Sequence, residues 1–252
     1  KVMLHRAVAD RFDRKVNQVL YMYDGLDNQA VLYNFIARAF GTKVNAVPFE
    51  LLTNQLPLVV LKRLNKTLQR NLLVQTSGLY PSEDAPGLPD CFGTQKLHPS
   101  VWKRKGLRPP SFPEKRIVQF SAFVAACDFE LLAEYLLPAE AYNYLVALTG
   151  KMNQHPEEVL SENLLNQLLI NAILPYFWFK SLRMSDENLQ KFVLELMEQL
   201  RPEDNFILKK WGKIGVLAAN AYESQALIEL YNEYCSRKKC LNCQVGVKLL
   251  NG

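Results

Sequence analysis

The sequence lacks the features that mark secreted, membrane-spanning and disulfide-framed proteins. No charged segment followed by an apolar core indicates a signal peptide. The most apolar run, residues 164–179, is interrupted by amide side chains and by Pro175, so it is too short and too polar to span a bilayer. Five cysteines are an odd number, which without a secretory signal favours reduced thiols. We therefore expect a cytoplasmic protein that does not contact a membrane.

Recognisable catalytic arrangements are also missing from the sequence. The histidines His5, His98 and His155 have no carboxylate or nucleophile placed by spacing to act with them. Residues 212–215 contain two glycines and a lysine, but they lack the length and the flanking strand of a phosphate-binding loop. We therefore expect that the chain is not an enzyme by itself.

Helical periodicity dominates the sequence that is present, and few segments alternate as strands do. Asp27, Ser161 and Ser185 stand where helix N-caps are expected, and Pro175 should kink the helix that contains it. The helices are expected at residues 4–24, 28–40, 46–54, 57–76, 114–126, 128–136, 139–149, 161–183, 186–200, 204–212 and 215–234. This pattern predicts an all-α multi-helix bundle that ends in a short, cysteine-containing knuckle.

A proline- and glycine-rich stretch interrupts the helical pattern at residues 77–113. Seven of the thirteen prolines lie between Pro81 and Pro113, which predicts a long irregular connection. We expect one α-helical domain whose internal boundary falls in this loop, between residues 1–76 and 114–252. The chain opens at Lys1, inside an amphipathic stretch and without an initiator methionine, which suggests that an amino-terminal part precedes it.

Positive charge is concentrated in four short segments, residues 62–70, 101–116, 209–213 and 235–252. Together they carry a net +16 against −11 for the rest of the chain. If the segments converge in the fold, they form one basic face suited to nucleic acid. The alternative is that each segment is an ordinary solvated helix face.

The segment from Trp102 to Arg116 has the mixture of cations and aromatic rings that proteins use on single strands and phosphates. The alternative is a proline-stiffened loop that Trp102 and Phe112 fix to the bundle while its cations stay in water. The predicted nucleic-acid-binding residues are Trp102, Lys103, Arg104, Lys105, Arg108, Arg116, Lys209, Lys210, Lys213, Arg237, Lys238 and Lys239.

Three cysteines lie close together near the end of the chain, at Cys235, Cys240 and Cys243. Thiolates at this spacing suit zinc or an iron–sulfur cluster, although both normally take four ligands and no fourth lies nearby. The alternative is that Cys235 packs as a small apolar side chain on the buried face of the last helix while the other two close the terminus.

Several stretches occur together in a combination that resembles a bacterial protein family. They are residues 40–50 (FGTKVNAVPFE), 56–58 (LPL), 108–113 (RPPSFP), 116–120 (RIVQF), 171–175 (NAILP), 209–211 (KKW) and the closing run of residues 224–246 with its three cysteines. The chain resembles, over essentially its whole length, the carboxy-terminal portion of the family catalogued as domain of unknown function 2851. That family has no established activity.

Longer members of this family carry an amino-terminal segment similar to restriction-endonuclease-like nucleases. The resemblance implies that metal-dependent phosphodiester chemistry belongs to that part. It further implies that the present chain is its helical DNA-engaging or regulatory partner. The function expected from the sequence is therefore a non-catalytic, nucleic-acid-binding accessory domain of a DNA-processing protein, and the alternative is a helical scaffold that binds protein.

Overall fold

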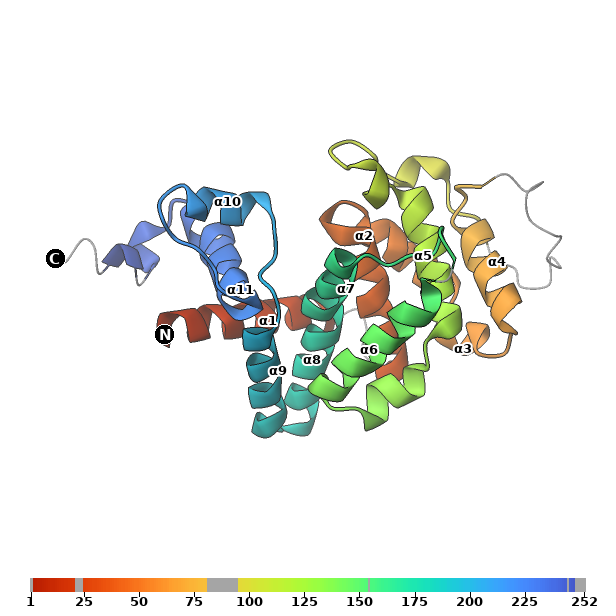
Figure 1. Cartoon of the computed structure of the whole chain (residues 1–252), viewed down its shortest axis with the longest axis horizontal. Coiled ribbons are helices and arrows are strands. Elements are labelled where there is room, and N and C mark those ends of the chain that lie inside the picture. Colours follow the sequence, from red (N-terminus) through yellow and green to blue (C-terminus); the bar gives the residue numbers. More distant parts are fainter. Residues whose placement is uncertain (1, 21–24, 81–94, 154, 244, 248–252) are drawn as a thin grey trace. The chain divides into compact units, whose positions relative to one another are not determined.

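The computed structural model describes residues 2–20, 25–80, 95–153, 155–243 and 245–247, and every regular element in these ranges is a helix (Figure 1). The predicted all-α fold is therefore confirmed. The chain forms two compact units, which we call the central unit (Gly25–Ile173) and the terminal unit (Lys1–Asp24 with Leu174–Gly252). The described residues of the proline-rich stretch, 77–80 and 95–113, belong to the central unit, and residues 81–94 of the predicted boundary lie outside the described residues.

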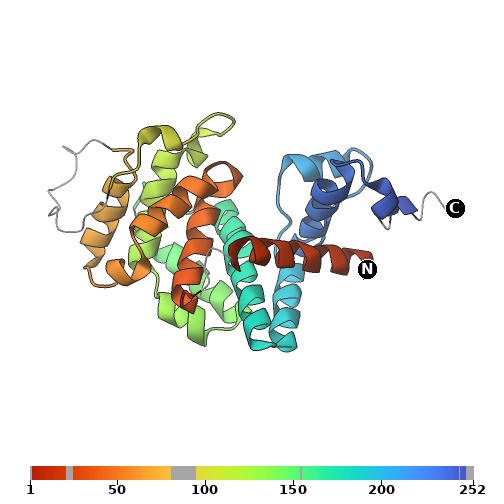
Figure 2. The ribbon, with the colours of Figure 1, turned by 180° about the vertical axis from the view of Figure 1, so that it is seen from behind.

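The central unit is built around its longest helix, α2 (Asn28–Gln55). Helix α2 packs against α5, η6 and α7, and α5 packs along α4 (Figures 1 and 2). The other helices of this unit are α3 (Leu58–Leu61), α4 (Lys66–Thr76), η3 (Pro99–Val101), η4 (Pro109–Ser111), α5 (Pro113–Ala126), η5 (Leu131–Tyr135), α6 (Pro138–Met152), α7 (Glu162–Leu168) and η6 (Leu169–Ile173).

An aromatic cluster forms the centre of this unit. The Phe120 ring of α5 lies edge-on to Phe40 and Phe49 of α2, with 5.4 Å between ring centroids in each pair. All three rings are fully buried. Edge-on aromatic pairs add a specific attraction to the hydrophobic gain from burial, so they fix how α5 lies on α2.

Helix α2 is broken in its middle, where the sequence predicted two separate helices. Thr42 has φ of 55° and ψ of −162°, outside the helical region. The preceding Gly41 could not carry a Cβ without meeting the Ala46 backbone nitrogen at 2.8 Å. Glycine at this position permits the close approach, and Asn45 beyond the kink hydrogen-bonds to Lys103.

The terminal unit is a smaller bundle that includes both ends of the chain. Its helices are α1 (Val2–Leu20), α8 (Leu174–Met184), α9 (Glu187–Gln199), α10 (Phe206–Gly212), α11 (Ala221–Leu230), η7 (Tyr231–Cys235) and η8 (Cys240–Asn242). Helix α1 packs against α8 and α11. The Phe12 ring stacks on Trp178 at 5.2 Å, and the Trp178 indole donates a 2.7 Å hydrogen bond to Asp13. These contacts tie the start of the chain to residues far along the sequence.

The sequence indicated three helix N-caps, and two of them are observed. Asp27 accepts a 2.7 Å hydrogen bond from the Ala30 amide, and Ser161 accepts one from Leu164, so these two predicted caps are confirmed. The predicted cap at Ser185 is wrong, because the neighbouring Asp186 is the residue that caps α9. In the described ranges no helix is long and apolar enough to cross a bilayer.

The last long helix begins later than predicted. Residues 215–220 are not helical, and α11 starts after its cap, Asn220, which accepts a hydrogen bond from the Glu223 amide. A π-helical turn, η7, then follows α11 and changes the register of the side chains. For this reason Cys235, which the sequence placed on the buried face, is exposed. Leu217, in the non-helical stretch before α11, is exposed as well.

Candidate nucleic-acid interface

Trp102 is a buried anchor in the central unit. Its indole nitrogen donates a 2.8 Å hydrogen bond to the carbonyl oxygen of Ser77, at the end of α4. Its ring lies edge-on to Phe49, with centroids 5.3 Å apart at an interplanar angle of 87°. Since only 4% of the residue is exposed, it cannot stack on a base. The prediction that Trp102 contacts nucleic acid is therefore wrong, and the alternative of a fixed loop is correct for this residue.

Asn45 holds the next residue of the same segment. Its amide nitrogen donates to the carbonyl of Lys103 at 2.9 Å, and its amide oxygen accepts from the Lys103 backbone N–H at 2.8 Å. A side-chain amide that satisfies both backbone groups of one residue fixes that residue much as a neighbouring strand would. The chain therefore leaves the bundle at a defined point after Trp102.

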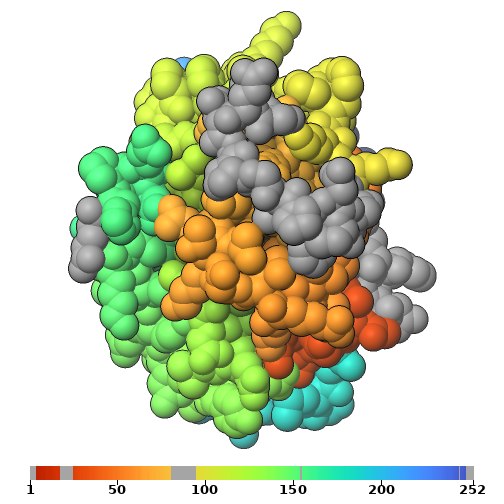
Figure 3. All heavy atoms as spheres, turned by 90° about the vertical axis from the view of Figure 1, so that its right-hand side faces the viewer, coloured from red at the N-terminus to blue at the C-terminus, as the bar shows by residue number. Residues whose placement is uncertain are grey.

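A tight turn follows, which we call the cationic turn (residues 103–108). The Leu107 N–H donates a 3.1 Å hydrogen bond to the Arg104 carbonyl, and Gly106 has φ of +83°. A type II turn needs this positive φ at its third residue, where glycine is the usual residue. In Figure 3 the yellow residues of this part of the chain lie along the upper edge of the face, above the orange α3–α4 region.

Three cations of the cationic turn are free. The side chains of Lys103, Lys105 and Arg108 are exposed. In the described part of the chain none of them has an ion pair. Arg104 differs, because its Nε donates to the Glu114 carboxylate at 2.8 Å. The turn therefore presents three positive charges within six residues. Its backbone is held at Lys103, the first residue of the turn.

Arg116 does not belong to this exposed group. Only 7% of the residue is exposed, and burial lowers the pKa of its guanidinium to about 10. Arg116 is therefore not an exposed surface cation like those of the turn, and its guanidinium donates instead to Ser111 and Gln119.

The 62–70 segment lies at the other end of α4 from the Trp102 anchor. Lys62 and Arg63 precede the cap of α4, Asn65, whereas Trp102 is bonded to Ser77 beyond its last turn. Eleven helical residues separate the two ends, or about 16 Å at 1.5 Å per residue. Within the central unit the basic segments therefore do not form one cluster.

The terminal unit carries the other predicted cations, and several of these are engaged. Lys209 pairs with Asp204 at 3.2 Å and Arg237 with Glu233 at 3.0 Å. Lys210 donates a 2.6 Å hydrogen bond to the Tyr231 hydroxyl. The exposed cations of this unit's two segments that have neither an ion pair nor a side-chain hydrogen bond among the described residues are Lys213, Lys238 and Lys239.

An exposed apolar surface next to α10 was not anticipated from the sequence. Phe206, Ile214 and Leu217 are 66%, 70% and 80% exposed. The Lys210 ammonium lies 4.4 Å from the centroid of the Phe206 ring. The apolar run at residues 214–217 could have indicated this surface. We instead interpreted that run as the start of the last helix.

The three terminal cysteines are not arranged as a metal site. Cys235 and Cys240 are exposed whereas Cys243 is buried, which reverses the burial expected for Cys235. In the residues that the structure covers, no three His, Cys, Asp or Glu side chains are grouped so that they could hold a metal ion. The donor set therefore does not fit zinc or an iron–sulfur cluster.

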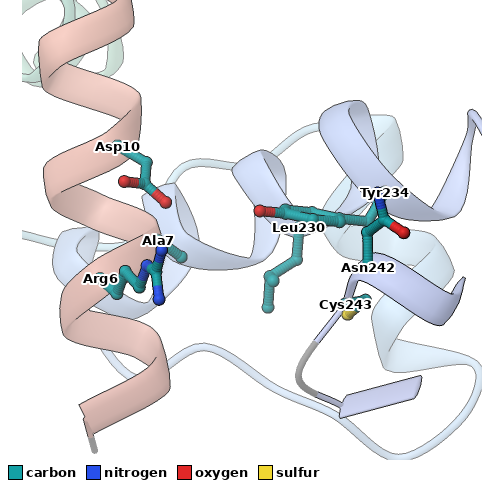
Figure 4. A pocket seen from close by; sticks show the side chains of 7 residues that line it. All are labelled: Arg6, Ala7, Asp10, Leu230, Tyr234, Asn242 and Cys243. Atoms are coloured by element: carbon teal, nitrogen blue, oxygen red, sulfur yellow. The ribbon is translucent and has the colours of Figure 1, made fainter. Parts of the chain in front are cut away.

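A small pocket lies beside these cysteines in the terminal unit. Its volume is about 90 Å³, and its lining comes from α1, from the end of α11 and from the turn after it (Figure 4). Figure 4 shows Arg6 and Asp10 on one side and Tyr234 with Cys243 on the other. The pocket is small compared with typical ligand sites of about 300–1,000 Å³.

The reactivity of the Cys127 thiol tests how strongly its surroundings in the central unit raise its pKa. Burial raises the pKa of its thiol, and a hydrogen bond from the Tyr144 hydroxyl offsets only part of that effect. The native thiol thus keeps its proton where an unfolded cysteine, with a pKa of about 8.5, loses it. We expect Cys127 to resist iodoacetamide at pH 9 while the exposed Cys240 reacts, as read by peptide mass spectrometry.

The sign of the linked effect on stability follows from the same shift. A raised native pKa means that the unfolded chain releases the proton first, so the free energy of unfolding falls as pH rises above about 8.5. The Cys127→Ala variant should lose this part of the pH dependence. Equal alkylation of Cys127 and Cys240 in the native protein would contradict the prediction.

Comparison with known protein families matches residues 1–206 to the family described as protein of unknown function DUF2851. The chain belongs to the DUF2851 family. No curated protein matches the chain. No solved structure matches it either. The match ends before residues 209–211 and before the three cysteines, so the resemblance is confirmed for most of the chain but not for its closing run.

The family match contains the cationic turn and excludes the terminal cations. Residues 103–108 lie within the matched region, whereas Lys213, Lys238 and Lys239 lie beyond it. Membership gives no activity, because the family has none assigned. The site must therefore be argued from its own geometry.

Proposed function

We propose that this member of the DUF2851 family binds nucleic acid through the cationic turn of its central unit. The observation that carries the proposal is the set of three exposed cations, Lys103, Lys105 and Arg108, which have no ion pair in the described residues. Their backbone is fixed by Asn45 and Trp102. A pre-fixed group of cations loses less conformational entropy on binding than a flexible one.

The chemistry of the turn favours the phosphate backbone over the bases as its ligand. Lysine and arginine contact phosphate oxygens, and these contacts give affinity without sequence information. Trp102, the aromatic residue expected to stack on bases, is buried. We therefore propose sequence-independent binding. The role as a carboxy-terminal, non-catalytic part of a longer DNA-processing protein, which the resemblance implied, stays a prediction.

The proposal is tested by the salt dependence of binding to a labelled DNA duplex, measured by fluorescence anisotropy. Three phosphate contacts predict a slope of log K against log salt of about −2.7, which is roughly a fortyfold loss of affinity between 50 and 200 mM salt. Absence of binding at 50 mM salt, or binding that does not respond to salt, would contradict the proposal.

A further inference from the structure

Arg116, on the first turns of α5, is a buried cation without a counter-charge. It is 7% exposed, and its Nη1 and Nη2 atoms donate to Gln119 and Ser111 at 3.3 Å each. Its Nε has no hydrogen-bond partner among the residues that the structure describes. A guanidinium has five N–H donors, and both of its bonds here are at the long end of the normal range. No carboxylate pairs with it in the described chain.

This arrangement is unusual on physical grounds. Buried charges in proteins are normally paired, because an unpaired one keeps the full cost of leaving water. The partners of Arg116 are a hydroxyl and an amide, and neither carries a charge. With a pKa lowered to about 10, the side chain is still protonated at neutral pH.

The start of α5 supplies a second set of anion-binding groups at the same place. The helix has fourteen residues, begins with Pro113 and has no side-chain cap. In the described chain the N–H groups of Glu114 and Lys115 have no partner, as expected for a first helical turn. The Arg116 guanidinium folds back to Ser111, just before this turn. The helix dipole and the guanidinium therefore place positive charge at one end of α5.

One carboxylate, that of Glu114, lies in the same turn and must be considered. Arg104 binds its Oε1 through a 2.8 Å hydrogen bond from Nε. Its Oε2 is buried and has no hydrogen-bond partner within the described ranges. The Arg104–Glu114 pair is neutral as a unit, so the net charge around the helix start still comes from Arg116 and Lys115.

We propose that the start of α5, with Ser111 and the Arg116 guanidinium, is a phosphate-binding site. Helix N-termini bind phosphate through free N–H groups, and arginine matches phosphate oxygens with parallel hydrogen bonds. The cationic turn ends at Arg108, three residues before Ser111. This inference rests on the proposed function, because the phosphate would be one of the nucleic-acid backbone that the turn holds.

The test measures thermal unfolding of the whole chain in sodium phosphate and in sodium chloride at equal ionic strength. Phosphate should raise the melting temperature of the central unit, since a ligand that binds only the folded state stabilises it. In the Arg116→Met variant, the apparent affinity for phosphate should fall at least about tenfold, as expected when a charge-assisted bidentate contact is lost. Arg63→Met, which removes an exposed arginine of the same unit, is the matched control.

The melting temperature of the Arg116→Met variant in the absence of phosphate distinguishes a binding role of Arg116 from a structural one. We expect this variant to melt at the same temperature as the parent protein or higher, because an uncompensated buried charge has been removed. A lower melting temperature in chloride would overturn the inference, as would an equal phosphate response in both proteins. The Ser111→Ala variant leaves Arg116 in place and should also weaken the stabilisation by phosphate, so it tests the same site independently.

The outcomes also separate this site from the proposed function. A phosphate response that depends on Arg116, in a protein that does not bind duplex DNA, would support the site and contradict the function. Salt-dependent DNA binding without any phosphate response would support the function and overturn the site.

Discussion

Replacing Trp102 by alanine should lower the free energy of unfolding of the central unit by about 3–5 kcal/mol, the usual cost of removing a buried large aromatic side chain. The substitution removes a ring that packs edge-on against Phe49 and also leaves the Ser77 carbonyl without its 2.8 Å donor. Both losses occur where the proline-rich stretch joins α4. Urea denaturation followed by circular dichroism measures the effect.

The same substitution should weaken binding of nucleic acid even where the protein remains folded. Trp102 fixes the chain immediately before Lys103, so its loss adds conformational freedom to the cationic turn. Trp102→Phe is the matched control, because it keeps an aromatic ring and loses only the indole hydrogen bond. A Trp102→Ala variant as stable as Trp102→Phe would show that Trp102 is not the anchor described here.

Replacing Glu229 by alanine should destabilise the terminal unit by a similar amount, about 3–5 kcal/mol, because it breaks a buried ion pair. The Glu229 side chain is 3% exposed and accepts a 3.1 Å hydrogen bond from the Arg14 Nε. Its Oε2 also lies 3.6 Å from Arg11. Burial lowers the pKa of Arg11, and the charges of Glu203 and Glu229 partly offset that effect. Without Glu229, the repulsion between the positive charges of Arg11 and Arg14 is offset by fewer negative charges.

Glu233, one turn further along, gives the matched control. It is 20% exposed and pairs with Arg14 at 3.7 Å and with Arg237 at 3.0 Å. Exposed pairs of this kind contribute about 0–1 kcal/mol, so Glu233→Ala should have little effect on unfolding. Equal losses for the two variants would contradict the account of α1 as held to α11 by a buried ion network.

The helices could be predicted from the sequence because their signals are local. The caps at Asp27 and Ser161 and the proline at the start of α5 act within a few residues of the helix ends that they set. The boundary between the units could not be predicted in this way. It depends on α1 packing against α11, and the ion pair of Arg14 with Glu229 spans 215 residues.

The exposure of the lysines in the 101–116 segment could be expected from the sequence, but the burial of Trp102 and Arg116 could not. A tryptophan among cations is equally consistent with a base-stacking residue and with a loop anchor, and the deciding contact with Ser77 lies 25 residues away. The burial of Arg116 could not be predicted either, because it depends on how α5 packs in the bundle. The exposure of Cys235 could not be predicted because the π-helical turn η7 shifts the register of the preceding helix.

The central claim is that the cationic turn binds nucleic-acid phosphates, and a matched pair of variants tests it most directly. One variant combines Lys103→Gln, Lys105→Gln and Arg108→Gln. The other combines Lys62→Gln, Arg63→Gln and Lys66→Gln at the far end of α4, so both lose the same charge. The measurement is the slope of log K against log salt for a DNA duplex.

We expect the first variant to reduce the magnitude of the slope by about 2.7 and the second to leave it nearly unchanged. Equal slopes in the two variants would show that net charge alone drives binding. An unchanged slope in the first variant would show that the turn does not contact phosphate, and the exposed apolar surface beside α10 would then be the stronger candidate, as a site for a protein partner.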